Sequence, residues 1–100
     1  DGMIRHIVLL TWTDDATDEQ KAAVEKGLAA LPAAIPELRR YDLGSDLGLA
    51  AAGNSDFAIV AEFDSVADYE VYRDHPQHHA VINEHIVPIK AGRAAIQFEL

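Results

Sequence analysis

The chain contains no cysteine. Disulfide frameworks, thiolate metal sites and cysteine nucleophiles are therefore excluded. A chain without disulfides suits a reducing compartment, and we expect a cytoplasmic location.

Basic residues are scarce as well, since 8 Lys and Arg face 17 Asp and Glu and the formal net charge is −9 at pH 7. Nucleic acids and anionic membranes both favour clustered positive charge. In addition, no apolar run is long enough to cross a bilayer, and the N-terminus lacks a basic-then-apolar signal pattern. We therefore expect neither nucleic acid nor a membrane as a partner.

Two groups of functional motifs are missing. The glycines form neither GxGxxG nor GxxxxGK[ST], so no phosphate-binding loop is indicated. No serine occupies a nucleophile-elbow pattern. The sequence thus gives no sign of a nucleotide-dependent enzyme or of a serine hydrolase.

What remains is a chain of 100 residues, of which 49% are hydrophobic. That length is typical of one domain with a modest core. We expect residues 3–100 to form this single domain, and we interpret residues 1–2, before Met3, as the remnant of a cleaved tag.

Apolar spacing and capping signals predict the secondary structure. Thr17 and Gln20 form a capping box, and Pro32 and Pro36 predict the end of the first helix with an irregular turn after it. His75-Pro76 predicts a break in the second helix, because the residue before proline is pushed out of helical geometry. We expect strands at 4–12, 38–47, 56–63 and 91–100, and helices at 18–31, 65–74 and 76–87.

The resulting β-α-β-β-α-β order is that of a ferredoxin-like α+β fold. The charges and Gly44 in the second strand favour an edge position. The first strand is largely apolar on both faces. Helices can cover one face, but a domain of this size has no second sheet for the other. A partner subunit is the simplest cover, so we expect a homodimer.

Residues 65–85 hold four of the five histidines and two of the three tyrosines. Tyr72 and His78 flank the helix break, so a kink can bring a phenol and an imidazole to one pocket. Such a pair can carry acid–base chemistry, with the imidazole taking a proton and the phenol orienting it or donating to an oxyanion. His6, a single polar residue on an apolar strand face, is either a satisfied core histidine or a wall of that pocket.

Other interpretations of the same residues stay open. Tyr72 can simply pack, and His75 before proline can bond to the backbone. A zinc site through His75 and His79, with Glu84 or His85 nearby, is the other functional interpretation, although no HExxH pattern is present.

The sequence resembles the stress-responsive A/B barrel domain (Dabb) family over essentially 3–100. The resemblance rests on MIRHIVLLTW at the start, on FDSVADY and on YRDHPQH in the middle, together with the Ile35-Pro36 turn. It implies a ferredoxin-like monomer that pairs through its sheet faces into a dimeric α+β barrel, with a pocket between sheet and helices.

An enzymatic branch of this family contains polyketide cyclases, which close a ring on a poly-β-keto chain by aldol chemistry without metal or organic cofactor. The resemblance assigns His78 and Tyr72 to the acid–base pair of that branch and His6 to its strand histidine. His75 matches the histidine before proline, which we interpret as mainly structural.

The same resemblance indicates where a substrate would lie. We expect it to contact His75, Leu28, Val8, Trp12 and Ile82. Leu28 stands where plant cyclases carry a further pocket tyrosine, so the same substrate is not expected. No metal ligand set and no cofactor are expected.

Three hypotheses follow. The first is a cofactor-independent enzyme, such as a polyketide cyclase, acting on a poly-β-keto or similar small enolisable substrate. The second is a non-catalytic stress-response or small-ligand-binding protein, in which the same residues satisfy one another. The third is a monooxygenase-like or detoxifying activity, and fold alone does not separate these.

Overall fold

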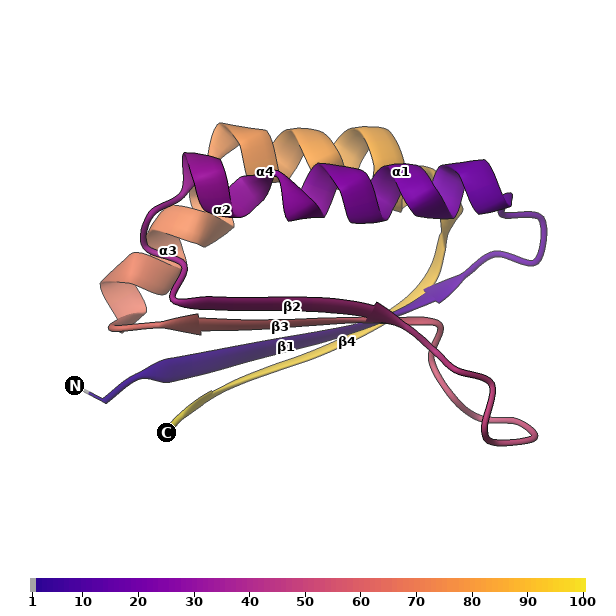
Figure 1. Cartoon of the computed structure of the whole chain (residues 1–100), viewed down its shortest axis with the longest axis horizontal. Coiled ribbons are helices and arrows are strands. Elements are labelled where there is room, and N and C mark those ends of the chain that lie inside the picture. The colour runs from indigo at the N-terminus through magenta and orange to yellow at the C-terminus, as the bar shows by residue number, and fades with distance from the viewer. Residues whose placement is uncertain (1) are drawn as a thin grey trace.

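The computed structural model describes residues 2–100 and consists of one antiparallel sheet with all helices on one of its faces (Figure 1). Asp1, the first of the two residues interpreted as a tag remnant, lies outside the described residues. The strands are β1 (Ile4–Trp12), β2 (Arg40–Ser45), β3 (Phe57–Phe63) and β4 (Lys90–Glu99). The helices are α1 (Asp18–Ala29), α2 (Leu31–Ala34), α3 (Val66–Asp74) and α4 (Pro76–Val81), followed by a π-helical turn η1 (Ile82–Ile86) and a 3-10 turn η2 (Val87–Ile89).

The strand order in the sheet is β2-β3-β1-β4. Every neighbouring pair is antiparallel, with Val8 opposite Ile59 on β3 and opposite Ala95 on β4. This is the ferredoxin-like α+β arrangement, and β2 occupies an edge, as the sequence predicts. Both chain ends lie at the same end of the sheet, and the long β2–β3 connection projects beyond the other end (Figure 1).

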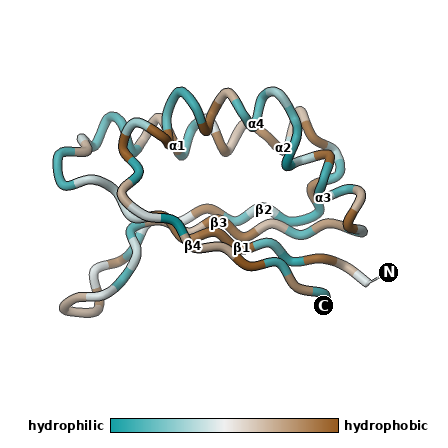
Figure 2. Tube along the Cα trace, turned by 180° about the vertical axis from the view of Figure 1, so that it is seen from behind, coloured by the Kyte–Doolittle hydropathy of each residue, from teal (hydrophilic) through white to brown (hydrophobic). Residues whose placement is uncertain are grey.

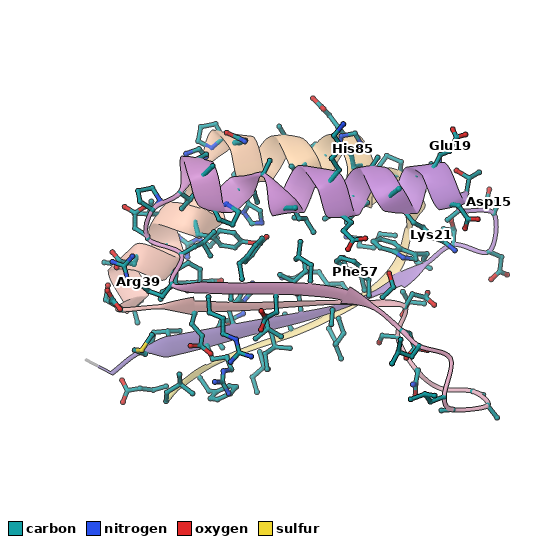
Figure 3. The ribbon with its side chains drawn as sticks, viewed as in Figure 1. Asp15, Glu19, Lys21, Arg39, Phe57 and His85 are labelled. Carbon is teal, nitrogen blue, oxygen red and sulfur yellow. The ribbon has the colours of Figure 1, made fainter. Side chains whose placement is uncertain are left out.

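The core lies between the sheet and the helices, where side chains of both layers meet (Figure 3). Alternation along β1 turns Val8 and Leu10 toward the helices, and the same alternation turns Phe57 and Ile59 of β3 inward. The tube in Figure 2 alternates between hydrophilic and hydrophobic colours along the helices, as expected of helices with one buried face.

The other face of the sheet is apolar and uncovered within one chain. Leu9 of β1 is 40% exposed, and Ile96 and Phe98 of β4 are 57% and 39% exposed. The register places Ile96 opposite Ile7, so these residues share the face away from the helices. The first strand is thus apolar on both sides, as the sequence predicts.

The region after the first helix differs from the prediction. The helix ends at Ala29, two residues before the predicted end, and the segment between the prolines is the short helix α2 rather than an irregular turn. Pro32 lies in the first turn of α2, where its missing N–H costs no hydrogen bond.

The second helix breaks between Asp74 and Pro76, as predicted, but helical structure continues past the predicted end. Residues 82–89 form η1 and η2, and Pro88 lies in the first turn of η2, a position that tolerates proline. Within residues 2–100, none of the helices is long and apolar enough to span a bilayer.

Candidate functional site

A small cavity of about 130 Å³ lies between the sheet and the broken helix. Its apolar wall comes from β1, β3 and η1, and its polar groups come from β1, β4 and the two sides of the helix break. The lining residues are His6, Val8, Leu10, Ile59, Tyr72, His78, Ile82, Ile86, Lys90 and Arg93.

The helix break positions His78. The side chain of His75 accepts a hydrogen bond from the backbone N–H of Gln77 at 3.1 Å and thereby caps α4. His78 then lies in the first turn of α4 and faces Tyr72 across the break, with the two rings stacked at a centroid distance of 4.1 Å.

One hydrogen bond fixes the tautomer of His78. Its Nδ1 lies 3.3 Å from the carbonyl oxygen of Arg73, which can only accept, so Nδ1 carries the proton and Nε2 is unprotonated in the neutral ring. Burial lowers the pKa of His78, and the backbone carbonyl groups near the ring oppose this only in part. The ring is therefore a neutral base at pH 7.

His6 has the opposite tautomer. Its Nδ1 lies 2.9 Å from the side-chain amide nitrogen of Gln97, which donates, so in the neutral ring the proton is on Nε2. Burial, together with the positive charge of Arg93, lowers the pKa of His6 to about 4. At pH 7 this ring is neutral and offers an N–H donor.

Tyr72 is buried, and its hydroxyl lies 2.9 Å from the hydroxyl of Tyr41 on β2. Burial raises the pKa of Tyr72 to about 12, so the phenol stays protonated. It orients His78 by ring stacking, whereas its hydroxyl bonds to Tyr41 rather than to the imidazole.

The predicted substrate contacts divide into two groups. Val8 and Ile82 line the cavity together with His6, Tyr72 and His78. The remaining three lie elsewhere: Leu28 is fully buried in the core, Trp12 packs against Phe57, and His75 caps α4.

Four residues of this region were not predicted, namely Tyr41, Gln97, Lys90 and Arg93. Strand alternation could have placed Tyr41 on the inner face of β2, next to Leu43. The pairing of Gln97 with His6 depends on the β1–β4 register, which the sequence does not specify.

The structure gives no support to a zinc site. Among residues 2–100, no three His, Cys, Asp or Glu side chains are grouped so that they could hold a metal ion. The ring of His79 instead donates from Nε2 to the carbonyl oxygen of Arg73 at 2.9 Å.

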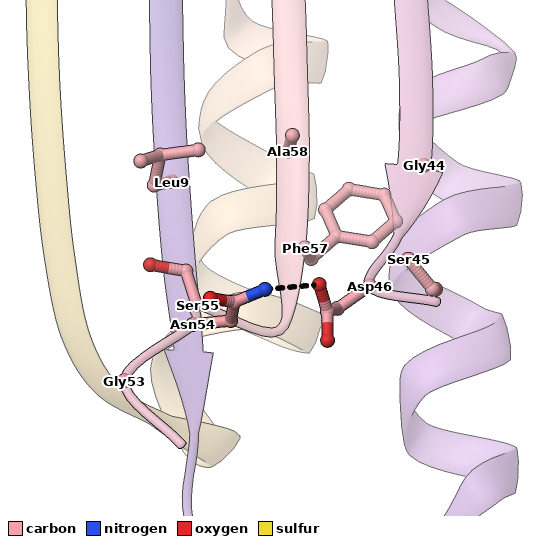
Figure 4. Close-up of a pocket in the computed structure, with 9 residues that line it drawn as sticks. All are labelled: Leu9, Gly44, Ser45, Asp46, Gly53, Asn54, Ser55, Phe57 and Ala58. Carbon is pink, nitrogen blue, oxygen red and sulfur yellow. Dashed lines mark hydrogen bonds between the residues drawn. The ribbon is translucent and has the colours of Figure 1, made fainter. Parts of the chain in front are cut away.

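A larger hollow of about 510 Å³ lies beside the β2–β3 connection (Figure 4). The side-chain amide of Asn54 donates to Asp46 there at 3.0 Å, and Leu9 contributes from β1. Its lining contains neither histidine nor tyrosine. The smaller cavity, which gathers the groups able to move protons, is therefore the candidate site.

Solved structures that are similar to this chain have the same ferredoxin-like fold. A dimeric ferredoxin-like protein of unknown function from Thermobifida fusca is 49% identical, with a TM-score of 0.90, covering 99% of this chain and 92% of that chain. A dimeric protein of unknown function with a ferredoxin-like fold from Bacteroides fragilis is 30% identical, with a TM-score of 0.85, covering 100% and 98%.

One similar structure has an enzymatic name. It is a hydroxynitrile lyase from Passiflora edulis, 22% identical with a TM-score of 0.86, covering 99% of this chain and 94% of that chain. At this identity the likeness concerns the fold alone. A comparison with functionally curated proteins gives no match.

The family follows from the match to one family model. The model of the stress responsive A/B barrel domain matches residues 4–100, which is nearly the whole chain. The chain therefore belongs to the stress-responsive A/B barrel domain (Dabb) family.

Proposed function

We propose that this protein is a cofactor-independent enzyme that removes a proton from a small carbonyl compound. One observation carries the proposal: His6 and His78 line one apolar-walled cavity in opposite tautomers. One ring then offers a base and the other a hydrogen-bond donor.

The two rings divide the chemistry. Nε2 of His78 takes the proton from the carbon next to the substrate carbonyl, and Nε2–H of His6 donates to the carbonyl oxygen as negative charge develops on it. Tyr72 holds the base by stacking. The enolate that results can add to a second carbonyl, which is the aldol step of a polyketide cyclase.

The size of the cavity favours a small substrate. Pockets for drug-sized ligands enclose about 300–1,000 Å³, whereas this cavity encloses about 130 Å³. A long poly-β-keto chain would require the cavity to open further, so we place a short β-keto compound ahead of it. The hydroxynitrile lyase among the similar structures supports the idea that this fold can carry lyase chemistry.

The second candidate is a non-catalytic protein that binds a small ligand. This candidate is favoured because polar groups of the site already form hydrogen bonds with other side chains of the protein. Tyr72 bonds to Tyr41, and His6 bonds to Gln97. Together with the modest cavity, these bonds are what a purely structural cluster would also show.

We further propose that the assembly is a homodimer that pairs through the outer sheet faces. Leu9, Ile96 and Phe98 form an exposed apolar surface there, and the similar structures from Thermobifida fusca and Bacteroides fragilis are dimeric. Burying this surface against a second copy would remove it from water.

The test of the enzyme is proton exchange. Acetoacetamide, a small neutral β-keto compound, is dissolved in deuterated buffer, and loss of the proton signal between its two carbonyl groups is followed by NMR. The wild type is expected to accelerate exchange over buffer, and His78→Gln to lower the enzyme-dependent rate by about 100-fold or more.

His79→Gln is the matched control, because His79 bonds to the same carbonyl oxygen but does not line the cavity. It is expected to retain the wild-type rate. If His78→Gln is as active as the wild type, His78 is not the base. If the wild type accelerates exchange of no short β-keto compound, the ligand-binding candidate replaces the enzyme.

A further inference from the structure

Two positive side chains at the cavity have no carboxylate partner. The described residues 2–100 include all five arginines, and Arg5, Arg39, Arg40 and Arg73 each form an ion pair with Asp or Glu. Among the described residues, Arg93 and Lys90 form no ion pair. Both line the cavity.

The lack of a partner sets Arg93 apart from the other four arginines, in a chain whose acidic residues outnumber basic ones by 17 to 8, whereas none of the three lysines forms an ion pair within residues 2–100. Both cations belong to the exposed residues of β4, while the apolar wall behind them is buried. They therefore lie at the solvent side of the cavity, and the histidines lie further in.

The strand register directs Arg93 toward the site. Arg93 pairs with Leu10, so its side chain leaves the sheet on the helix side, as does that of Gln97, which contacts His6. Its positive charge is close enough to His6 to contribute to the lowered pKa of that ring. This cation thus faces a cavity whose described lining residues include no Asp or Glu.

An anion of the right size would complete this arrangement. The planar guanidinium matches a carboxylate with two parallel hydrogen bonds, and an ammonium adds a second charge. We propose that the substrate carries a carboxylate, bound by Arg93 and Lys90 at the cavity opening, while its carbonyl group reaches His6 and His78.

This inference rests on the proposed function and narrows its substrate to short oxo acids. In a 3-oxo acid, the carbon that loses the proton lies between the carbonyl and the carboxylate. Anchoring the carboxylate at the opening would therefore hold that carbon between β4 and the histidines. Positioning of this kind is a major source of rate enhancement.

The test compares acetoacetate with acetoacetamide, which has the same number of non-hydrogen atoms and no charge. Binding is measured by NMR titration of the protein. The wild type is expected to bind acetoacetate at least tenfold more tightly than the amide, about the effect of one charge-assisted hydrogen bond. Equal affinities would overturn the proposal.

Variants of Arg93 and Lys90 test which residue causes the preference for acetoacetate over acetoacetamide. Arg93→Gln is expected to remove most of the preference, Lys90→Gln part of it, and Arg93→Lys is expected to keep part of it because the charge remains. Lys26→Gln, on α1 and away from the cavity, is the control and is expected to change nothing. An undiminished preference in Arg93→Gln would overturn the role of Arg93.

Two further readouts separate the alternatives. Binding of inorganic phosphate as tight as that of acetoacetate would overturn a carboxylate in favour of a phosphate group. Proton exchange of the neutral acetoacetamide is expected to require His78 but not Arg93, because this compound has no carboxylate for Arg93 to bind. Exchange without a carboxylate preference therefore contradicts this inference alone, whereas a preference without exchange contradicts the proposed function alone.

Discussion

At the residue scale, the site depends on which nitrogen of each histidine carries the proton. The carbonyl of Arg73 places it on Nδ1 of His78, and the amide of Gln97 places it on Nε2 of His6. A hydrogen bond of one ring nitrogen thus sets the chemistry of the other. Base and donor arise from two identical side chains through their different neighbours.

The lowered pKa of His6 makes stability depend on pH. The folded chain binds a proton at this ring only near pH 4, whereas the unfolded chain binds one near pH 6.5. Its stabilising contribution is therefore complete above pH 6.5 and is lost as the pH falls from there to about 4.

Urea unfolding at several pH values and fixed protein concentration measures this effect. The wild type should lose stability between pH 6.5 and 4, and His6→Gln, which has no titrating ring, should lose less. The same loss in both proteins would show that His6 titrates normally in the fold.

The hydroxyl pair of Tyr41 and Tyr72 offers a second residue-scale prediction. The two oxygens are 2.9 Å apart, and burial raises the pKa of both phenols, so both hydroxyls remain protonated. Removing one hydroxyl leaves the other hydroxyl buried without its hydrogen-bond partner. Tyr41→Phe and Tyr72→Phe should each destabilise the fold by about 1–3 kcal/mol.

The double variant distinguishes a coupled pair from two independent residues. Because the bond is already lost in either single variant, the double variant should be less destabilised than the sum of the two. Urea unfolding of all four proteins gives the coupling energy, and strict additivity would argue against the bond.

At the scale of elements, the close approach of α1 to the segment after the break is made possible by Gly27. A Cβ at this position would lie 3.2 Å from both terminal carbons of Val81. Gly27→Ala should therefore destabilise the fold by roughly 1 kcal/mol, since crowding of about 1–3 kcal/mol outweighs the gain of about 1 kcal/mol in helix propensity.

Gly44→Ala is the control, because a Cβ at Gly44 would meet no atom within 4 Å. Its effect on the free energy of unfolding should stay within about 0.5 kcal/mol of zero. A stabilised Gly27→Ala would show that Val81 moves aside without cost.

The sequence predicts the elements better than the site. Alternation, the Thr17 cap and Pro76 are local signals, and the strands, helix starts and helix break that they predict are present. The extension of helical structure beyond residue 87 to Ile89 was missed, because Pro88 is as compatible with a first helical turn as with a helix end.

The partners of the site residues were beyond the reach of local signals. Tyr41 meets Tyr72, and Gln97 meets His6, across 31 and 91 residues of chain. Such contacts depend on strand register and on the packing of helix against sheet, which no local pattern encodes. The catalytic roles assigned to His6, Tyr72 and His78 stay predictions.

At the scale of the whole molecule, the outer face of the sheet is apolar, and nothing within one chain covers it. Besides its exposed apolar residues, it carries Glu62, which is nearly buried and accepts from Arg5 at 2.8 Å and from Arg40 at 3.2 Å. A second copy on this face would cover the apolar residues and desolvate the ion pairs further. The uncovered apolar face is therefore the physical basis of the proposed homodimer.

A charge at the centre of that face should dissociate the dimer. Leu9→Glu is expected to shift the mass measured by light scattering from dimer toward monomer, since burying a carboxylate against a second copy is unfavourable. Val71→Glu on α3 is the control, because the two side chains are similarly exposed, at 40% and 43%. A dimer that survives Leu9→Glu unchanged would place the interface elsewhere.

The most direct measurement is ¹⁵N NMR of the histidine rings in the intact protein, followed as a function of pH. At pH 7, we predict that the ring of His78 carries its proton on Nδ1, with an unprotonated Nε2 and a pKa below 6.5, and that His6 carries its proton on Nε2. A proton on Nε2 of His78 at pH 7 would contradict its role as the base of this cavity.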